Sequence, residues 1–143
     1  MAQSKVLIVE DEAFLRELYV DTLSPEGYEV STAVDGEDAL NKIRQQKWDI
    51  ILLDIILPKM SAFQILEAFN ADSNNKNIGT PIIILTNLDS DFDIKRALSL
   101  GGSTYLIKSQ ITPGDLVKEV KLYLDKARMA QSEQVPQSPT PIV

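Results

Sequence analysis

Five short apolar runs of strand length, spread along the chain, constrain its fold more than any other feature. They cover residues 5–10, 28–33, 49–54, 81–86 and 103–108. Three of them, KVLIVE, DIILLD and PIIILT, are continuously apolar and rich in Val, Ile and Leu instead of alternating with polar residues. Runs of this kind are typical of strands that are covered on both faces, as in parallel sheets.

The segments between these runs have the spacing of amphipathic helices. They cover about residues 12–24, 36–46, 61–71, 90–100 and 112–129. Parallel strands need long crossovers, and helices of this length supply them. Five strands that alternate with five helices predict a doubly wound α/β fold with a five-stranded parallel sheet.

Capping residues support three of the predicted helices. Asp35 is the expected N-cap of the second helix, and Asp89 or Ser90 that of the fourth. The last helix has the clearest start, with Thr112 as N-cap, Pro113 at the first helical position and Asp115 completing a capping box. One domain over residues 1–129 is therefore expected, and the Pro- and Ser-containing segment 130–143 is expected to be a disordered tail.

Composition excludes several kinds of chemistry. The chain has no cysteine and no histidine, which leaves carboxylates, hydroxyls and lysines to carry any reaction. With 14 basic and 21 acidic residues the net charge is −7, which argues against direct binding of nucleic acid. No segment is long and apolar enough to predict a membrane span or a signal peptide, so a cytoplasmic protein is expected.

Chemically useful side chains follow the predicted strands. Glu10 and Asp11 follow the first strand, Asp54 ends the third, Thr86 ends the fourth and Lys108 ends the fifth. In doubly wound sheets ligands bind at the carboxyl ends of the strands, so these groups are expected to meet. Clustered carboxylates without nitrogen or sulfur ligands favour Mg2+, and an ionised carboxylate can accept a phosphoryl group without a base.

Each of these residues also has an ordinary structural interpretation. Asp11 alone is as readily a helix cap, Thr86 alone a turn hydroxyl, and Lys108 alone a solvated lysine. Their joint position at the ends of different strands is what indicates a site. Asp49, at the opposite end of the strand that Asp54 closes, has no such neighbours and is not predicted to react.

On these motifs the chain resembles the response regulator receiver domain, of the CheY-like superfamily, over about residues 5–129. VLIVEDE resembles the acidic pair of that family, and DIILLDIILPKM its phosphoacceptor strand and loop. The resemblance implies a flavodoxin-like (βα)5 fold with strand order 2-1-3-4-5.

The resemblance also implies roles for individual residues. Asp54 would be the phosphoacceptor, assisted by Thr86 and Lys108, and Mg2+ would be held by Glu10, Asp11, Asp54 and the main-chain carbonyl of Ile56. Thr86 and Tyr105 would be the switch pair, which remodels the surface of the fourth helix, fifth strand and fifth helix. The implied partners are a sensor histidine kinase or histidine phosphotransfer protein and a downstream protein target. Whether activation also forms a homodimer is left open.

Three positions depart from the family's pattern. Ser109 replaces the usual proline after the lysine, and because a non-proline cis bond costs roughly 3–4 kcal/mol, a trans Lys108–Ser109 bond is predicted. Asn87 replaces a small residue after the switch threonine and is expected to alter the lifetime of the aspartyl phosphate. Ser61-Ala62 stands where Asp-Gly or Ser-Gly is common, which questions the turn geometry there.

The expected function is that of a stand-alone receiver, which catalyses its own phosphorylation and dephosphorylation but is not a classical enzyme. No covalently attached output module is expected after the receiver motifs, so the signal is expected to pass by binding to another protein. One competitor, a phosphatase or phosphotransferase with an aspartyl phosphate, would need a second acid where Ile56 stands. The other competitor is an interaction module that works without phosphorylation, for which Asn87 and Ser109 are the best support.

Overall fold

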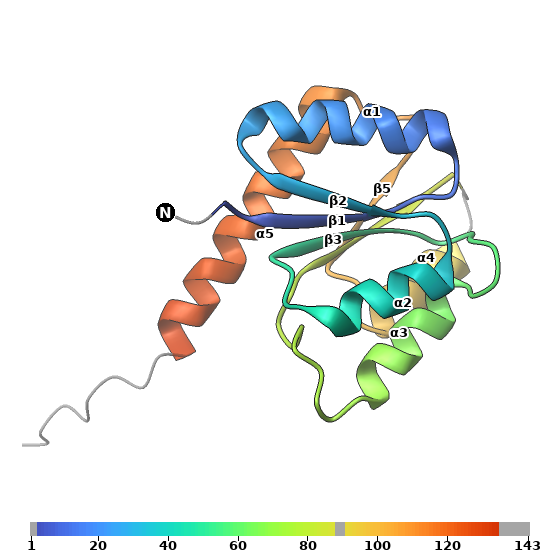
Figure 1. Ribbon diagram of the computed structural model, residues 1–143, viewed down its shortest axis with the longest axis vertical. Helices are drawn as coiled ribbons and strands as arrows, with labels where there is room; N and C mark the ends of the chain where they lie inside the picture. The colour runs from blue at the N-terminus through green and yellow to red at the C-terminus, as the bar shows by residue number, and fades with distance from the viewer. Residues whose placement is uncertain (1–2, 88–90, 135–143) are drawn as a thin grey trace, which may run out of the picture.

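The strands form one parallel sheet, seen in the computed structural model of the chain (Figure 1). The structure describes residues 3–87 and 91–134. The strands are β1 (Lys5–Val9), β2 (Glu29–Ala33), β3 (Ile50–Asp54), β4 (Ile82–Thr86) and β5 (Thr104–Ile107). Their spatial order is β2-β1-β3-β4-β5, and every pairing is parallel. The predicted fold class and strand order are confirmed.

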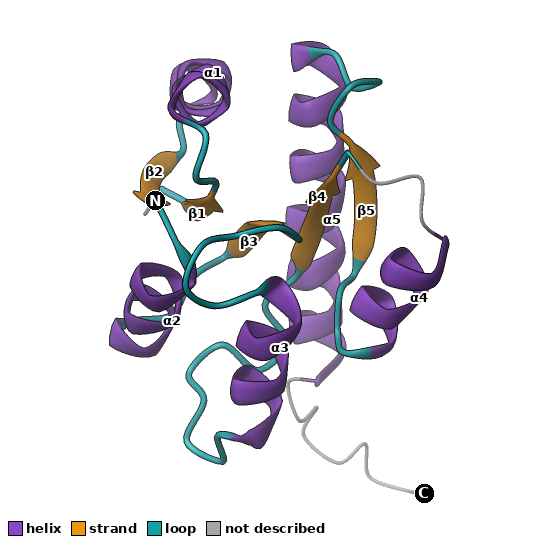
Figure 2. Cartoon of the chain, turned by 90° about the vertical axis from the view of Figure 1, so that its right-hand side faces the viewer, coloured by secondary structure: helices purple, strands orange, loops and turns teal. Residues whose placement is uncertain are grey.

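Helices connect successive strands and cover both faces of the sheet. They are α1 (Ala13–Leu23), α2 (Gly36–Gln45), α3 (Ala62–Ala71), α4 (Asp91–Ser99) and α5 (Pro113–Gln134), with a short 3-10 turn, η1 (Ser24–Glu26), after α1. Figure 2 shows α1 and α5 on one face of the sheet and α2, α3 and α4 on the other. Among the described residues no helix is long and apolar enough to cross a membrane.

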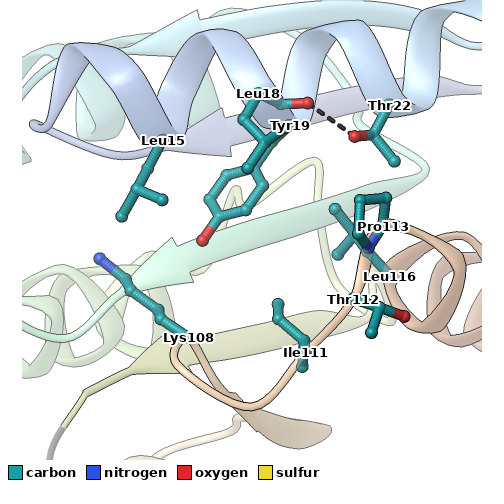
Figure 3. Close-up of a pocket in the computed structure, with 9 residues that line it drawn as sticks. All are labelled: Leu15, Leu18, Tyr19, Thr22, Lys108, Ile111, Thr112, Pro113 and Leu116. Atoms are coloured by element: carbon teal, nitrogen blue, oxygen red, sulfur yellow. Dashed lines mark hydrogen bonds between the residues drawn. The ribbon is translucent and has the colours of Figure 1, made fainter.

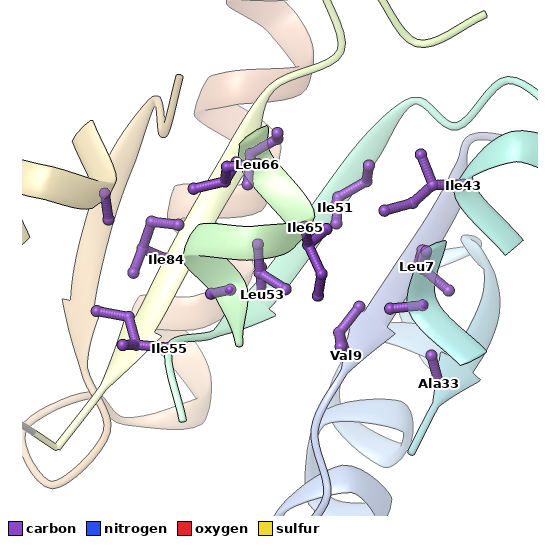
Figure 4. Packing of buried hydrophobic residues seen from close by; sticks show 14 of the residues in the cluster. Leu7, Val9, Ala33, Ile43, Ile51, Leu53, Ile55, Ile65, Leu66 and Ile84 are labelled. Carbon is purple, nitrogen blue, oxygen red and sulfur yellow. The ribbon is translucent and has the colours of Figure 1, made fainter. Parts of the chain in front are cut away.

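The central strands bury side chains on both faces, as their continuous apolar sequences predict. Along β1, Val6 and Ile8 pack with α1 and α5, whereas Leu7 and Val9 pack with α2 and α3 (Figure 4). β3 and β4 repeat this alternation, and every residue of both strands is buried. Burying an aliphatic side chain of this size stabilises the fold by about 1.5–3 kcal/mol, so two apolar layers hold the strand ends in place.

Two of the predicted helix caps are present. Asp35 Oδ1 accepts a hydrogen bond from Asp38 N at 2.8 Å. Thr112 and Asp115 form the reciprocal pair, with distances of 3.1 Å for Asp115 N to Thr112 Oγ1 and 3.0 Å for Thr112 N to Asp115 Oδ2. The predicted caps of α4, Asp89 and Ser90, lie outside the described residues.

The boundary at residue 129 needs a correction. Helix α5 continues through Gln134, so residues 130–134 are helical and are not part of a disordered tail. Ala130 and the Gln and Glu residues that follow it are good helix formers, and Pro136 is the first residue that would interrupt the helix. The rest of the predicted tail, residues 135–143, lies outside the described residues.

A buried amide orders the polar loop between α3 and β4. Asn77 is fully buried and lies against the segment that joins α2 to β3. Its Oδ1 accepts hydrogen bonds from Trp48 N at 2.6 Å and Thr80 Oγ1 at 3.2 Å. Its Nδ2 donates to the carbonyls of Ile43 and Gln46 at 2.7 and 3.0 Å. One side chain thus satisfies several buried polar groups at the end of the sheet opposite the candidate site.

Candidate functional site

The carboxyl ends of the strands bring the predicted site residues together. Glu10 follows β1, Asp54 closes β3, Thr86 closes β4 and Lys108 follows β5. These four side chains are buried or nearly so, in a protein where most charged residues are exposed. Beside them lies an open cleft of about 360 Å3. Its lining comprises Asp11, Glu12, Asp54, Ile56, Thr86, Asn87 and Lys108.

Lys108 joins the two buried carboxylates. Its Nζ lies 2.5 Å from Glu10 Oε1 and 2.6 Å from Asp54 Oδ2. The three side chains are at most 7% exposed, so little water is available to stabilise their charges. A buried carboxylate is costly unless it is paired, and here one ammonium pairs with both.

Burial and pairing act in opposite directions on these groups. Burial raises the pKa of Glu10 and Asp54 raises it further, although the Lys108 ammonium opposes both effects. Burial alone would lower the pKa of Lys108, but its hydrogen bonds to Asp54 and Glu10 outweigh that effect and raise it. Lys108 therefore remains a cation at neutral pH.

The carboxylates have the chemistry of a hard-cation site. Oxygen atoms of Glu10, Asp11 and Asp54 lie within 4.8 Å of one another, and this is the one such acidic cluster in the described part of the chain. Lys108 carries one positive charge against three carboxylates, so a divalent cation would neutralise the remaining negative charge. Asp11 is on the exposed side of the cluster, where a cation could keep its water ligands. The residues therefore fit Mg2+.

Main-chain contacts hold the acidic residues in position. Arg16 of α1 donates from Nη1 to the carbonyls of Glu10 and Asp11, at 2.9 and 3.1 Å, which fixes the β1–α1 connection. The main-chain N–H of Ile56 donates to Asp54 Oδ1 at 3.2 Å. The role of Arg16 was missed from the sequence, because an arginine on an exposed helix face carries no signal of a contact with a loop carbonyl.

The loop after Asp54 packs against the start of α2. Gly36 N donates to Pro58 O at 3.2 Å, and a Cβ at Gly36 would lie 2.1 Å from Met60 O, so only glycine fits there. Lys59 adopts a φ of 68°, in the left-handed region. Ser61 then caps α3 in a capping box with Gln64, so a well-formed helix start follows the turn that Ser61-Ala62 had put in question.

The remaining predicted residues are placed as follows. Ile56 lines the cleft, and its carbonyl as a metal ligand stays a prediction. Tyr105 lies outside the cleft; the residue is 42% exposed and borders a surface hollow with residues of α5. No cis peptide bond occurs among the described residues, so the predicted trans Lys108–Ser109 bond is confirmed. Asp49, which was not predicted to react, accepts a hydrogen bond from Lys5 N at 2.7 Å.

Tyr19 of α1 is a buried core residue that lies next to Lys108 of the site. It is 3% exposed, and burial raises its pKa from the ordinary value of 10 to about 12. Below pH 10 the phenol is protonated in both the folded and unfolded states. Between pH 10 and 12 the unfolded chain releases this proton while the folded protein keeps it, so the free energy of unfolding falls as pH rises.

The expected consequence is a difference between wild type and Tyr19→Phe in alkali. Between pH 9 and pH 11 the wild type should lose roughly 1 kcal/mol more unfolding free energy than Tyr19→Phe. Urea unfolding of both proteins at each pH measures this difference. Equal losses in the two proteins would show that Tyr19 titrates normally.

Comparison with known proteins agrees with this geometry. Residues 6–121 match the response regulator receiver domain family. The alkaline phosphatase synthesis transcriptional regulatory protein PhoP of Bacillus subtilis is 34% identical over 126 residues, which are 88% of this chain and 50% of PhoP. The chain spans about half the length of the curated relatives it matches.

Solved receiver structures share the fold. A CheY-like receiver domain protein from Methanospirillum hungatei superposes with a TM-score of 0.81 at 28% identity, over 90% of this chain and 99% of that one. The receiver domain of a sensor histidine kinase from Pseudomonas aeruginosa has a TM-score of 0.77 at 26% identity, over 87% and 99%. That structure has a magnesium ion coordinated in its active site cleft. By its sequence match, its strand order and the acidic cleft at the strand ends, this chain belongs to the response regulator receiver domain family.

Proposed function

We propose that the chain is a phosphorylation-activated switch, in which Asp54 accepts a phosphoryl group from a phosphohistidine donor. The donor would be a sensor histidine kinase or a histidine phosphotransfer protein. The observation that carries this proposal is the position of Asp54, at the mouth of the cleft and in contact with Lys108. The family supports the same function.

The proposed chemical step uses Asp54 as the nucleophile. A carboxylate oxygen attacks the phosphorus, an O–P bond forms, and the P–N bond breaks with its electron pair passing to the imidazole nitrogen. Because the attacking group is a carboxylate and not a hydroxyl or a thiol, no general base is needed. Attack of water on the aspartyl phosphate would later release phosphate and restore the carboxylate. The protein thus catalyses its own modification without being a classical enzyme.

Charge neutralisation is the main contribution of the site. Negative charge on the transferring oxygens must be stabilised, and we assign this role to Lys108 and the Thr86 hydroxyl, which both line the cleft. Glu10, Asp11, Asp54 and the Ile56 carbonyl would hold Mg2+, which neutralises phosphoryl charge when it is bound. The magnesium in the related Pseudomonas receiver supports this assignment.

The proposed output is a change of surface. Thr86 would move toward the phosphoryl group and Tyr105 would turn inward, which would alter the α4–β5–α5 face. The two residues lie on neighbouring strands, β4 and β5, and Tyr105 is exposed at present. A local charge would thereby bias a two-state element, and a downstream protein would read the result. We place this signalling in the cytoplasm and assign it no direct nucleic-acid contact, in keeping with the net charge of −7.

The competing functions fit the site less well. A phosphatase or phosphotransferase would need an acid two residues after Asp54, but the exposed side chain there is that of Ile56. An interaction module without phosphorylation would have no need to keep two buried carboxylates on one lysine beside an open cleft.

Phosphoryl uptake tests the proposal. The protein is incubated with acetyl phosphate, with Mg2+ or with a chelator, and its intact mass is measured. One added phosphoryl group in the presence of Mg2+, and none with the chelator, is expected. Equal uptake under both conditions would contradict the metal assignment, and no uptake under either would contradict the phosphoacceptor function.

Asn87 should control how long the aspartyl phosphate survives. Its side chain lines the cleft beside Thr86, where its amide can shield the phosphoryl group or hydrogen-bond to it. Loss of one such hydrogen bond corresponds to roughly a fivefold change in rate. Asn87→Ala is therefore expected to dephosphorylate about fivefold faster than wild type, measured as phosphate release. Asn74→Ala, at an exposed position outside the cleft, is the control and should match wild type. Equal or slower release from Asn87→Ala would refute this role.

A further inference from the structure

A buried hydroxyl next to the site has no hydrogen-bond partner in the described part of the chain. This is the hydroxyl of Tyr19, on α1. Tyr19 is 3% exposed, and Figure 3 shows its hydroxyl on the side of the ring that faces Lys108. A buried polar group without a partner is destabilising, so such groups usually bind a water molecule or have a functional role.

A small cavity lies beside this hydroxyl, between α1 and the β5–α5 connection (Figure 3). Its volume is about 40 Å3, which is enough for a water molecule. Tyr19 and Lys108 both line it. The two lining threonines already have partners, since Thr22 Oγ1 donates to Leu18 O and Thr112 Oγ1 accepts from Asp115 N. Of the polar side-chain atoms that line the cavity, the Tyr19 hydroxyl is the buried one that has no partner among the described residues, so a water held there would bind to it.

Lys108 has an N–H group that can donate a hydrogen bond to such a water. An ammonium carries three N–H donors, and the contacts to Glu10 and Asp54 account for two of them. The Tyr19 hydroxyl stays protonated at neutral pH, because burial raises its pKa to about 12. It can therefore accept one hydrogen bond and donate another.

We propose that Tyr19 is a positioning residue for Lys108, and that a water molecule in this cavity links the Tyr19 hydroxyl to the Lys108 ammonium. The inference rests on the proposed phosphoryl transfer and adds a residue to it. With a metal ion and a phosphoryl group bound, Glu10 and Asp54 would turn toward them, and Lys108 would exchange its present partners. The link to Tyr19 then keeps the ammonium at the cleft wall, where it faces the transferring oxygens.

The rate of phosphorylation tests this role. Tyr19→Phe keeps the ring and removes only the hydroxyl. With acetyl phosphate and saturating Mg2+ its single-turnover rate is expected to fall about threefold to tenfold, as for the loss of one hydrogen bond. Its Mg2+ affinity, measured by calorimetry, should be unchanged because Tyr19 is not a metal ligand. Tyr28→Phe is the matched control, since Tyr28 packs against the same hydrophobic cluster away from the cleft, and it should keep the wild-type rate.

Two further measurements separate positioning from packing. In a Lys108→Met background, Tyr19→Phe should cause no additional loss of rate. In unphosphorylated protein labelled with 13C at the tyrosine ζ carbons, the Tyr19 resonance should shift on the Lys108→Met change, while the Tyr28 resonance should not. Equal rates for wild type and Tyr19→Phe, an undiminished loss in the Lys108→Met background, or an unmoved Tyr19 resonance would overturn the inference. If wild type gained no phosphoryl group, the proposed function would be contradicted instead. The chemical shift of the Tyr19 ζ carbon would still show whether Tyr19 and Lys108 are linked.

Discussion

Lys108→Met is expected to slow phosphoryl transfer to Asp54 by about a hundredfold, the effect of removing one preorganised charge from the transferring oxygens. The same change should lower the free energy of unfolding by about 3–5 kcal/mol at neutral pH, because it leaves two buried carboxylates without their counter-ion. Phosphorylation rates and urea unfolding measure the two effects.

The stability loss in Lys108→Met should depend on pH and on metal. Burial and the neighbouring Asp54 both raise the pKa of Glu10, and Lys108 is the group that lowers it. Without the Lys108 ammonium, the pKa of Glu10 should therefore rise further. As pH falls toward 4.5, the ordinary pKa of a glutamate, Glu10 takes up a proton and no longer repels Asp54. The loss of unfolding free energy in Lys108→Met should therefore be smaller at pH 5 than at pH 7. Added Mg2+ should also reduce it. Lys121→Met, on the exposed surface of α5, should behave as wild type. A pH-independent deficit would show that Lys108 acts only through packing.

Asn77→Ala should cost about 3 kcal/mol or more of unfolding free energy. It would leave the Trp48 N–H and the Ile43 carbonyl buried without partners, each at about 1–3 kcal/mol. Asn77→Asp keeps the acceptor oxygen but loses both donors and buries a charge, so it should be comparably destabilising. Lys76→Ala, at the exposed neighbouring position, should change stability by less than about 0.5 kcal/mol. Urea unfolding of the three variants measures this. An Asn77→Ala protein as stable as Lys76→Ala would refute the structural role of the amide.

The architecture was predictable because its signals are local. Continuous apolar runs such as residues 50–53 identify strands covered on both faces, and these strands do bury residues on both sides of the sheet. Capping residues such as Thr112 and Asp115 mark helix starts through contacts three residues apart. Once the sheet is parallel, the strand ends must share one edge, so the meeting of Glu10, Asp54 and Lys108 follows from chain order.

Contacts between distant segments were not predictable in the same way. Nothing in the polar sequence NADSNNKNIG distinguishes the buried Asn77 from its exposed neighbours, because its partners lie about thirty residues away. The Tyr19 ring has the spacing of a core residue, and only the packing of α1 against the β5–α5 connection brings its hydroxyl near Lys108. The end of α5 was misplaced because Ser and Gln residues after position 129 are compatible with a helix as well as with a tail.

The role of Asp54 is tested most directly by comparing it with Asp49, which directly precedes β3 at the opposite end of the strand. Asp49→Asn and Asp54→Asn are isosteric changes at opposite ends of the strand, and the amide oxygen in Asp49→Asn would still accept the hydrogen bond from Lys5 N. Both variants and wild type are incubated with acetyl phosphate and Mg2+ and weighed intact by mass spectrometry. Wild type and Asp49→Asn should each gain one phosphoryl group, and Asp54→Asn should gain none. A phosphoryl group on Asp54→Asn, or none on wild type, would contradict the mechanism.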